Sequence, residues 1–421
     1  LPIHPEAKQL YFGVLIAGTG KTWADDLQLL VDGKPIWDAP KAPRKETVLD
    51  RDHEFDNGSN VESAHLSQAQ IDNLVILGKV WGFLKYHHPK VTAGHVHWDY
   101  ELFRVLPPLL KARDRATAND VIVRWIRALG PLEPCNNCAE LDRKELQLAP
   151  DVDWISDKKM LGAELSQTLL AVHKNRPTGD QFYIAMAPGV GNPSFEHEPS
   201  YNNIKLPDFG YQLLALYRFW NAVEYWSPYR DIIGESWDGV LAESIPRVAL
   251  AADATTYKRE LQRAVAKLHD GHANLWTALD AIPPSGPCQL PVMLRFIENQ
   301  ATVGRVLPNS GGFNIGDVIT GIDGTSIGSL VEGLQRYYGA SNSAGMQDMV
   351  ARSLTRGPCL ESEVTVRRGN EDIHLRLARV PLTSDPSMYT HDLPGPAFRL
   401  LSKDIAYLKL SSVKVADAAK Y

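Results

Sequence analysis

The spacing of hydrophobic residues divides this chain into regions of different character. Leu74, Leu77, Trp81 and Leu84 recur every three to four residues, which is the spacing of one buried face of a helix. This spacing prevails through residues 67–275. We therefore expect that region to be mostly helical.

The helical pattern occurs twice. Leu213, Leu216, Trp220 and Val223 repeat the first set at a constant offset of 139 residues, as from Trp81 to Trp220. The same offset relates aromatic, proline and acidic residues in pairs: Tyr86 with Tyr225, Pro89 with Pro228, Trp98 with Trp237, Asp99 with Asp238 and Pro107 with Pro246. Each copy predicts a helix, a Pro-containing turn, a helix that starts at Trp-Asp, and two more helices. Duplicated helical units can bury their apolar faces against each other. We place the first copy and an insert at residues 67–206, and the second copy at 207–280.

Residues 288–380 change to the shorter period of β-strands. The pattern predicts, in order, strands at 290–296 and 301–306, the block Gly-Asp-Val-Ile-Thr-Gly-Ile-Asp-Gly at 316–324, a helix at 329–338, and a closing hairpin at 363–369 and 373–377. This order resembles a PDZ domain. Such a module binds an extended peptide between a strand and a helix, and backbone amides of a loop hold the peptide's terminal carboxylate. The loop at Gly311, Gly312 and Phe313 is the candidate peptide-binding segment.

The two ends of the chain also predict strands. In residues 1–50, Leu27, Leu29 and Val31 alternate with polar residues, and Asp32-Gly33 is a hairpin signal. With the Gly-x-Gly-x-x-Trp-x-Asp-Asp pattern before them, they resemble the last strands of a β jelly-roll of the carbohydrate-binding type. Polar residues 51–66 predict a linker. Residues 381–421 predict a Pro-rich linker and then a strand at 404–410, so we expect the chain to start inside one domain and to stop inside another.

Composition limits the classes of function. The chain has 421 residues, 44% hydrophobic and 22% charged, so we expect several soluble globular domains. Its formal net charge of −6 argues against a nucleic-acid partner, which requires clustered Lys and Arg. No apolar run of about 18 residues predicts a transmembrane helix.

The four cysteines permit more than one interpretation. Cys135 and Cys138 form a single C-x-x-C, which a local disulfide, a pair of thiols, a redox pair or half of a metal site would each explain. Cys288 and Cys359 flank the β-rich region and could be joined in an oxidising compartment.

Two other groups of residues look like chemical sites. His87, His88, His95 and His97 lie close together, but no set of carboxylates or cysteines completes a metal-ligand pattern, and we expect turn and surface histidines. The residues 324–328 match Gly-x-Ser-x-Gly, but a hydrolase nucleophile requires a large parallel sheet around it. A turn followed by Ser329 as a helix cap explains that segment better. We expect no metal and no cofactor.

The stretch Leu-His-Asp-Gly-His at residues 268–272 lies between the second helical copy and the β-rich region. This order of motifs, from about residue 208 to 421, resembles the C-terminal-processing (tail-specific) serine peptidases, especially the branch similar to the tricorn core protease. The resemblance implies that His272 is the general base and that the PDZ-like module recruits substrate tails. The family's Ser nucleophile, oxyanion hole and supporting carboxylate or Lys follow the terminal strand, and none of them is present in this sequence.

The sequence therefore predicts a multidomain α+β protein with partial jelly-roll strands, a duplicated all-α unit, a PDZ-like module and the first strand of a catalytic domain. The expected function is that of the N-terminal part of a serine endopeptidase, inactive as this fragment. Its expected partners are peptides or protein tails, with carbohydrate as a further candidate, and its expected location is extracytoplasmic. The alternative is a non-catalytic scaffold that binds peptides or glycans.

Overall fold

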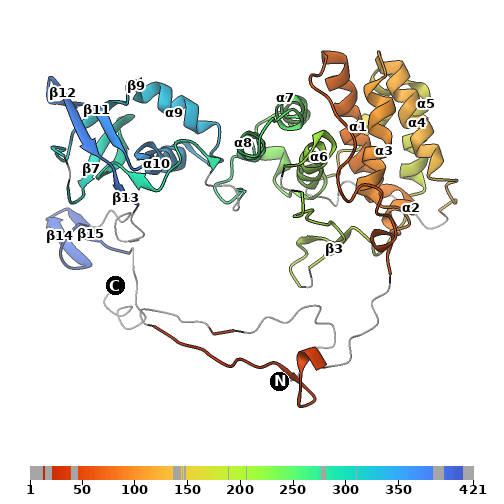
Figure 1. The fold of residues 1–421 in the computed structure, drawn as a ribbon, viewed down its shortest axis with the longest axis horizontal. Coiled ribbons are helices and arrows are strands. Elements are labelled where there is room, and N and C mark those ends of the chain that lie inside the picture. The colour runs from red at the N-terminus through yellow and green to blue at the C-terminus, as the bar shows by residue number, and fades with distance from the viewer. Residues whose placement is uncertain are drawn as a thin grey trace. The chain divides into compact units, whose positions relative to one another are not determined.

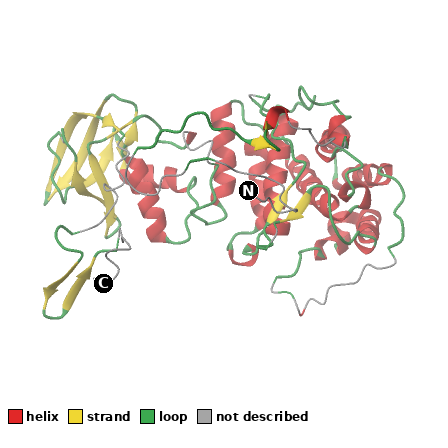
Figure 2. Cartoon of the chain, turned by 90° about the horizontal axis from the view of Figure 1, so that it is seen from below, coloured by secondary structure: helices red, strands yellow, loops and turns green. Residues whose placement is uncertain are grey.

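The computed structural model describes residues 13–14, 21–38, 46–135, 144, 146, 148–187, 189–204, 206–275, 281–309, 311–382 and 393–410. The chain divides into two compact units, Leu1–Arg51 and Asp52–Tyr421. Helices and several small sheets are both present, which confirms the expected mixture of α and β structure (Figure 1, Figure 2). Within the described residues, no helix is both long enough and apolar enough to cross a membrane.

The first unit contains one very short hairpin. β1 (Leu30–Val31) pairs with β2 (Lys34–Pro35), and the turn residues Asp32 and Gly33 have positive φ angles, which confirms the predicted hairpin turn. Short 3-10 helices follow at Ile36–Asp38 and Val48–Asp50. The longer alternating strand expected before the turn is wrong, because residues 21–29 form no strand. In the described part of this unit no further strand pairs with this hairpin, and an isolated two-stranded hairpin is at best marginally stable.

Residues 52–66 have no helix or strand, but they pack firmly against the helical region. Phe55 and Val61 are buried in its core. Ser59 donates from its backbone N–H and its hydroxyl to the Asp208 carboxylate, at 2.6 and 2.7 Å. The same carboxylate accepts from the N–H of Tyr211 and so caps the first helix of the second copy. The predicted linker therefore contributes to the start of that helix.

The helices of the two copies correspond. The first copy has α1 (Gln68–His87), α2 (Pro89–Thr92), α3 (Trp98–Leu110) and α4 (Arg115–Ala128); the second has α6 (Phe209–Trp226), a 3-10 turn (Arg230–Ile232), α7 (Trp237–Ala249) and α8 (Ala254–Ala266). The insert contains a 3-10 turn (Asp153–Ser156), α5 (Lys158–Lys174) and the hairpin β3 (Ile184–Met186) and β4 (Pro193–Phe195). All the apolar residues that defined the repeat are buried, which confirms the predicted helix faces.

The repeat extends to individual hydrogen bonds. In the first copy, the indole N–H of Trp81 donates to the Trp98 carbonyl at 3.2 Å, and the indole of Trp98 donates to the Trp81 carbonyl at 3.1 Å. In the second copy, Trp220 and Trp237 make the same reciprocal pair at 2.8 and 3.1 Å. A buried indole needs an acceptor. Each pair therefore fixes the first long helix of a copy to the start of the helix that follows the turn.

Equivalent positions of the two copies meet where α1 packs against α6 (Figure 1). A Cβ on Gly78 would lie 2.7 Å from the ring of Tyr217, the residue at the same place in the repeat. The rings of Tyr86 and Tyr225, another equivalent pair, lie 5.4 Å apart. Contacts between equivalent positions are the mark of a two-fold arrangement. The two helices therefore cross about a local pseudo-two-fold axis.

Ion pairs between the copies follow the same symmetry. Lys79 Nζ lies 2.6 Å from the Asp238 carboxylate. Arg218, the counterpart of Lys79, pairs with Asp99, the counterpart of Asp238. Both acids lie in the first turn of their helices, where a negative charge is favourable. Each acid therefore serves its own helix and also binds the other copy.

The β-rich region is built on a six-stranded antiparallel sheet. The strand order is β12-β11-β8-β7-β6, with β9 also paired to β8. The bounds are β6 (Val292–Ile297), β7 (Gln300–Val306), β8 (Val318–Ile322), β9 (Thr325–Ser326), β11 (Glu361–Arg368) and β12 (Glu371–Ala378). Its core also takes in α9 (Ile327–Gln335) and α10 (Ser343–Leu354). α9 and the closing hairpin were predicted, whereas α10 was not.

Two smaller sheets flank this one. β5 (Cys288–Gln289) lies between β10 (Arg356–Gly357) and β13 (Val380–Pro381), and a disulfide joins Cys288 to Cys359, which confirms that pairing. β14 (Phe398–Ser402) and β15 (Ile405–Leu408) form a separate hairpin. The predicted terminal strand is therefore present, but it is paired rather than alone. Cys135 is also disulfide-bonded, and Cys138 lies outside the described residues.

Candidate functional site

The Asp-Gly-His stretch begins where α8 ends. The backbone N–H groups of Leu268 and His269 bond back to carbonyls of the last helical turn, and His269 has a positive φ of 52°. His269 therefore makes the left-handed turn that ends the helix. Gly271 does not have a positive φ, so the turn does not depend on it. Gly271 packs closely against α10, because a Cβ there would lie 2.9 Å from Met349 Cε, the end of a flexible side chain.

Asp270 and His272 form a local pair. The Asp270 Oδ1 accepts from the backbone N–H of His272 at 2.9 Å and lies 3.2 Å from His272 Nδ1. The His272 N–H holds the pKa of the Asp270 carboxyl below its usual value, so this carboxylate is ionised near neutral pH. The side chain of His272 is 99% exposed. Asp270 thus orients the His272 ring through Nδ1, and Nε2 faces solvent.

Side-chain amides hold this loop to both neighbouring regions. Gln262, on α8, accepts from the Leu275 N–H at 3.0 Å and donates to the carbonyl of Tyr337 at 3.0 Å. Asn274 donates to the Gly271 carbonyl at 3.0 Å. A Cβ on Gly339 would lie 2.9 Å from the Asp270 carbonyl oxygen. The loop is therefore packed against the segment between α9 and α10, which belongs to the β-rich region.

His269 belongs to a different group. Its Nε2 lies 3.1 Å from the carboxylate of Glu235, which also binds Lys267 at 3.1 Å. Burial raises the pKa of Glu235, but the bonds to Lys267 and His269 outweigh it and lower the pKa overall. His269 is therefore occupied by Glu235, and His272 alone of this stretch has a ring free to face a partner.

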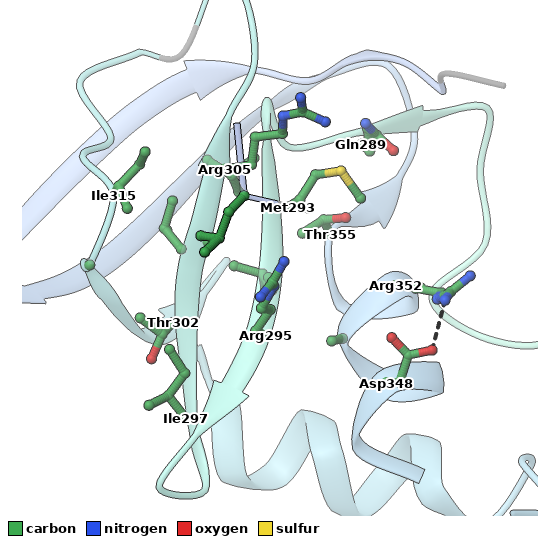
Figure 3. A pocket seen from close by; sticks show the side chains of 17 residues that line it. Gln289, Met293, Arg295, Ile297, Thr302, Arg305, Ile315, Asp348, Arg352 and Thr355 are labelled. Atoms are coloured by element: carbon green, nitrogen blue, oxygen red, sulfur yellow. Dashed lines mark ion pairs between the residues drawn. The ribbon is translucent and has the colours of Figure 1, made fainter. Parts of the chain in front are cut away.

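A groove of about 470 Å³ runs between the edge strand β6 and helix α10 (Figure 3). Met293, Arg295 and Ile297 come from the strand, whereas Asp348 and Arg352 come from the helix (Figure 3). β6 is the last strand of its sheet, so one of its edges has no strand partner in that sheet.

The backbone direction of β6 can be derived from its neighbour. Val303, on β7, pairs with Leu294, but the Val303 N–H and carbonyl bond to Asp317 and Gly316 at 2.8 and 2.9 Å. They point away from β6, which makes Leu294 and Val303 a non-hydrogen-bonded pair. The N–H and carbonyl of Leu294 therefore point out of the sheet edge, and by the two-residue alternation those of Phe296 do too.

The predicted peptide-binding loop lies between β7 and β8. Gly311 and Gly312 have positive φ angles, and Phe313 is buried in the core of the sheet region. A Cβ on Gly311 would lie 2.7 Å from Leu377 of β12, and the Gly312 carbonyl accepts from Arg368 of β11 at 2.8 Å. These three residues border the opposite end of the sheet. None of them is among the described residues that line the groove beside β6.

The other candidate groups have structural roles. Ser326 caps α9 by accepting from the N–H of Ser329 at 3.2 Å, so Ser326, rather than Ser329, is the cap. Burial lowers the pKa of His87 and of His88 to about 4, so both rings are neutral. Among the described residues, no group of three His, Cys, Asp or Glu side chains could hold a metal ion.

Sequence reasoning missed two features of these sites. The first is Asp270 as the partner of His272. The signal was an Asp two residues before His272, because an Asp side chain can accept a hydrogen bond from the backbone N–H two residues later and close a local turn. The second is α10, which forms one wall of the groove. Its signal was Asn342, whose side chain accepts from the Gly345 N–H at 2.8 Å and starts the helix.

No protein-family model matches the sequence, and no curated protein matches it. Among solved structures, CPAF, a chlamydial serine protease, overlaps with part of the chain. Mature CPAF complexed with lactacystin is 15% identical over 40% of this chain and 35% of its own, at a TM-score of 0.31. Mature CPAF is 14% identical over 40% and 34%, at a TM-score of 0.30. The chain thus spans about a third of the length of these neighbours, and overlaps of this size carry no argument about its function.

Proposed function

We propose that this chain is the N-terminal part of a serine endopeptidase that captures protein tails. The β-rich region is a PDZ-like module that binds the tail, and His272 acts as general base for a Ser supplied by sequence beyond Tyr421. The 421-residue chain alone is expected to bind peptides without hydrolysing them. An extracytoplasmic location and carbohydrate binding through jelly-roll strands remain predictions.

The observation that carries the proposal is the open edge of β6 beside α10. The outward N–H and carbonyl of Leu294 can pair with an extended peptide, which would lie as an added strand in the groove. Ala351 and Thr355 of the groove wall are small enough to leave room for peptide side chains. We therefore propose β6 and α10 as the peptide-binding site, in preference to the loop at Gly311, Gly312 and Phe313.

The geometry of Asp270 and His272 supports the catalytic part. In a Ser-His-Asp arrangement, a carboxylate bonds to Nδ1 of the His, which leaves Nε2 to accept the Ser proton. Asp270 lies on the Nδ1 side of His272 at 3.2 Å, and Nε2 is exposed. With Nδ1–H donating to Asp270, the Nε2 lone pair is available to a nucleophile that arrives from outside this chain.

Peptide capture is tested with a fluorescent, apolar tail peptide and two versions of it that carry N-methyl groups at alternate positions. Methylation removes the N–H groups from one edge of an extended peptide. We expect one version to lose binding and the other to keep it, because an added strand uses only one of its edges. Equal binding of both versions would contradict strand addition.

Catalysis is tested with the chain extended by the downstream sequence of its gene. We expect a fluorophosphonate probe to label a Ser in the extended protein and His272→Ala to lose both labelling and hydrolysis of the tail peptide. His269→Ala is the matched control and should retain both. Full activity in His272→Ala would exclude His272 as the base. An extended protein that binds tails and is never labelled would favour the non-catalytic scaffold.

A further inference from the structure

The groove beside β6 carries an excess of positive charge. Its described lining contains three guanidinium groups, those of Arg295, Arg305 and Arg352, and one carboxylate, that of Asp348. Asp348 and Arg352 lie one helical turn apart on α10 and pair at 2.8 Å (Figure 3). The charge of Arg352 is therefore already matched, whereas no acid of the lining matches Arg295.

The arm of Arg295 lies over Gly304, which has no side chain, on the next strand. Gly304 is the extra residue of a β-bulge, because Val303 pairs with Leu294 and Arg305 with Met293. A Cβ on Gly304 would lie 3.3 Å from both Cδ and Nε of Arg295. The arm of Arg295 thus lies across Gly304. A glycine inside a strand weakens it and commonly marks a bulge or a close approach.

The head group of Arg295 is unused. Across the part of the chain that the structure describes, no hydrogen bond or ion pair engages its guanidinium, and the residue is exposed. An unpaired guanidinium is a ready partner for a carboxylate, with which it can form two parallel hydrogen bonds.

We propose that Arg295 makes the groove selective for peptides with an acidic side chain opposite it. This inference rests on the proposed strand addition at β6. An added strand would place every second side chain on the face that carries Arg295, and the directly opposite residue would have its Cβ about 4.5–5.5 Å from that of Arg295. The preferred ligand is therefore an extended, apolar protein segment with one Glu or Asp at that position. Gly304 is the positioning residue for Arg295.

The expected preference is modest, because the pair lies at an exposed site. Opposite charges across a strand pair should strengthen binding by about two- to fivefold relative to a neutral residue. Salt should reduce this preference, since exposed charges are screened. Binding of a neutral peptide through the backbone should change little with salt.

The test compares peptides that differ only at one position, which carries Glu, its neutral isostere Gln, or Lys, moved stepwise along the same apolar sequence. Fluorescence polarisation gives the Kd of each. For the wild type, we expect one register at which Glu binds more tightly than Gln and Lys binds more weakly. In Arg295→Met, which keeps the apolar arm, the Gln peptide should bind as before and the Glu preference should disappear.

Two further variants separate charge from position. Arg376→Met removes an exposed charge on β12 that pairs with Glu361, and it should retain the Glu preference. Gly304→Ala keeps Arg295 but displaces its arm, and it should reduce the preference. Equal affinity for Glu and Gln at every register, or an unchanged preference in Arg295→Met, would overturn the role of Arg295 while leaving strand addition intact. If no peptide binds at all, strand addition and the inference built on it both fail.

Discussion

The side-chain amide of Asn221 occupies the space that a side chain on Gly82 would fill, and these two residues are counterparts in the helical repeat. Asn221 also donates to the Gly78 carbonyl at 3.0 Å, across the same helix pair. One copy has a glycine where the other has a larger residue at two successive turns. Duplicated helices have thus become complementary in shape at the positions where identical residues would collide.

This complementarity predicts that Gly82→Ala destabilises the protein. Alanine favours a helix over glycine by about 1 kcal/mol, but the new methyl group would overlap Asn221. We expect a net loss of about 1–3 kcal/mol in the free energy of unfolding, as for other overpacked cores. Gly333→Ala in α9 is the control, because a Cβ there meets no atom within 4 Å, and it should stabilise by a few tenths to about 1 kcal/mol. Urea unfolding measures both; a stabilising Gly82→Ala would contradict the packing.

The ion pair between Asp99 and Arg218 predicts a second effect. Asp99 is buried and also accepts from the Tyr201 hydroxyl at 2.8 Å. Replacing it with Asn removes the nearer of the two carboxylates beside the mostly buried Arg218 and leaves Glu198 at 3.8 Å, so we expect a loss of up to about 3–5 kcal/mol at pH 7. The exposed pair of Asp348 and Arg352 is the control, and Asp348→Asn should change stability by about 1 kcal/mol or less.

The same pair predicts a dependence on acid. Burial alone would raise the pKa of Asp99. The charges of Arg218 and Lys85 lower it by more than burial raises it, so the pKa lies below the usual value. A depressed carboxyl pKa stabilises the fold above the unfolded-state pKa, and this stabilisation is lost as pH falls through the folded-state pKa. The stability gap between wild type and Asp99→Asn should therefore narrow in acid. A stability difference between the two proteins that stays constant from pH 7 to the lowest pH at which the wild type folds would refute the lowered pKa of Asp99.

The carboxyl group of Glu224 should change the pH dependence of stability in the opposite direction to that of Asp99. Burial raises its pKa to about 7, against the opposing charge of Arg230. A carboxyl whose pKa is higher in the folded state than in the unfolded state costs stability as pH rises between the two values. Glu224→Gln should therefore stabilise the protein at pH 8 by up to about 3 kcal/mol, but not at pH 4. Thermal unfolding at the two pH values gives the difference, and an equal effect at both would contradict the raised pKa.

The disulfide between Cys288 and Cys359 should contribute strongly to the β-rich region. The bridged residues are 71 positions apart in sequence, and closing a loop of that length stabilises by about 4 kcal/mol in the chain-entropy model. The double variant Cys288→Ser, Cys359→Ser should lower the midpoint of unfolding and leave the tryptophan-rich helical repeat folded. Unfolding followed separately by tryptophan fluorescence and by a tail peptide's binding distinguishes the two regions. Loss of both signals at the same denaturant concentration as in the wild type would contradict this prediction.

The sequence predicted the helical repeat well because its signals are local. Leu74, Trp81 and their counterparts mark the buried faces, and Trp-Asp marks the start of α3 and α7. It also predicted the strands β6, β7, β11 and β12 of the β-rich region. The pairing of Lys79 with Asp238 was not predictable, because it depends on how the two copies pack.

The candidate sites were harder to derive from sequence. α10 has Gly345 in its first turn and only a short apolar stripe, so its periodicity is weak. The loop at Gly311 was expected to bind peptide from its composition, whereas the open edge of β6 follows from the strand order, which no local sequence pattern gives. The contact between Arg295 and Gly304 depends on a β-bulge, which no periodic pattern reveals.

The most direct test of peptide capture measures backbone amide exchange, residue by residue, with and without an apolar tail peptide. Leu294 and Phe296 have outward N–H groups on the edge of β6, so the account predicts that both amides become protected when the peptide is bound. The amides of Gly311, Gly312 and Phe313 should remain unchanged. Protection at that loop, with no change at Leu294 and Phe296, would contradict the account.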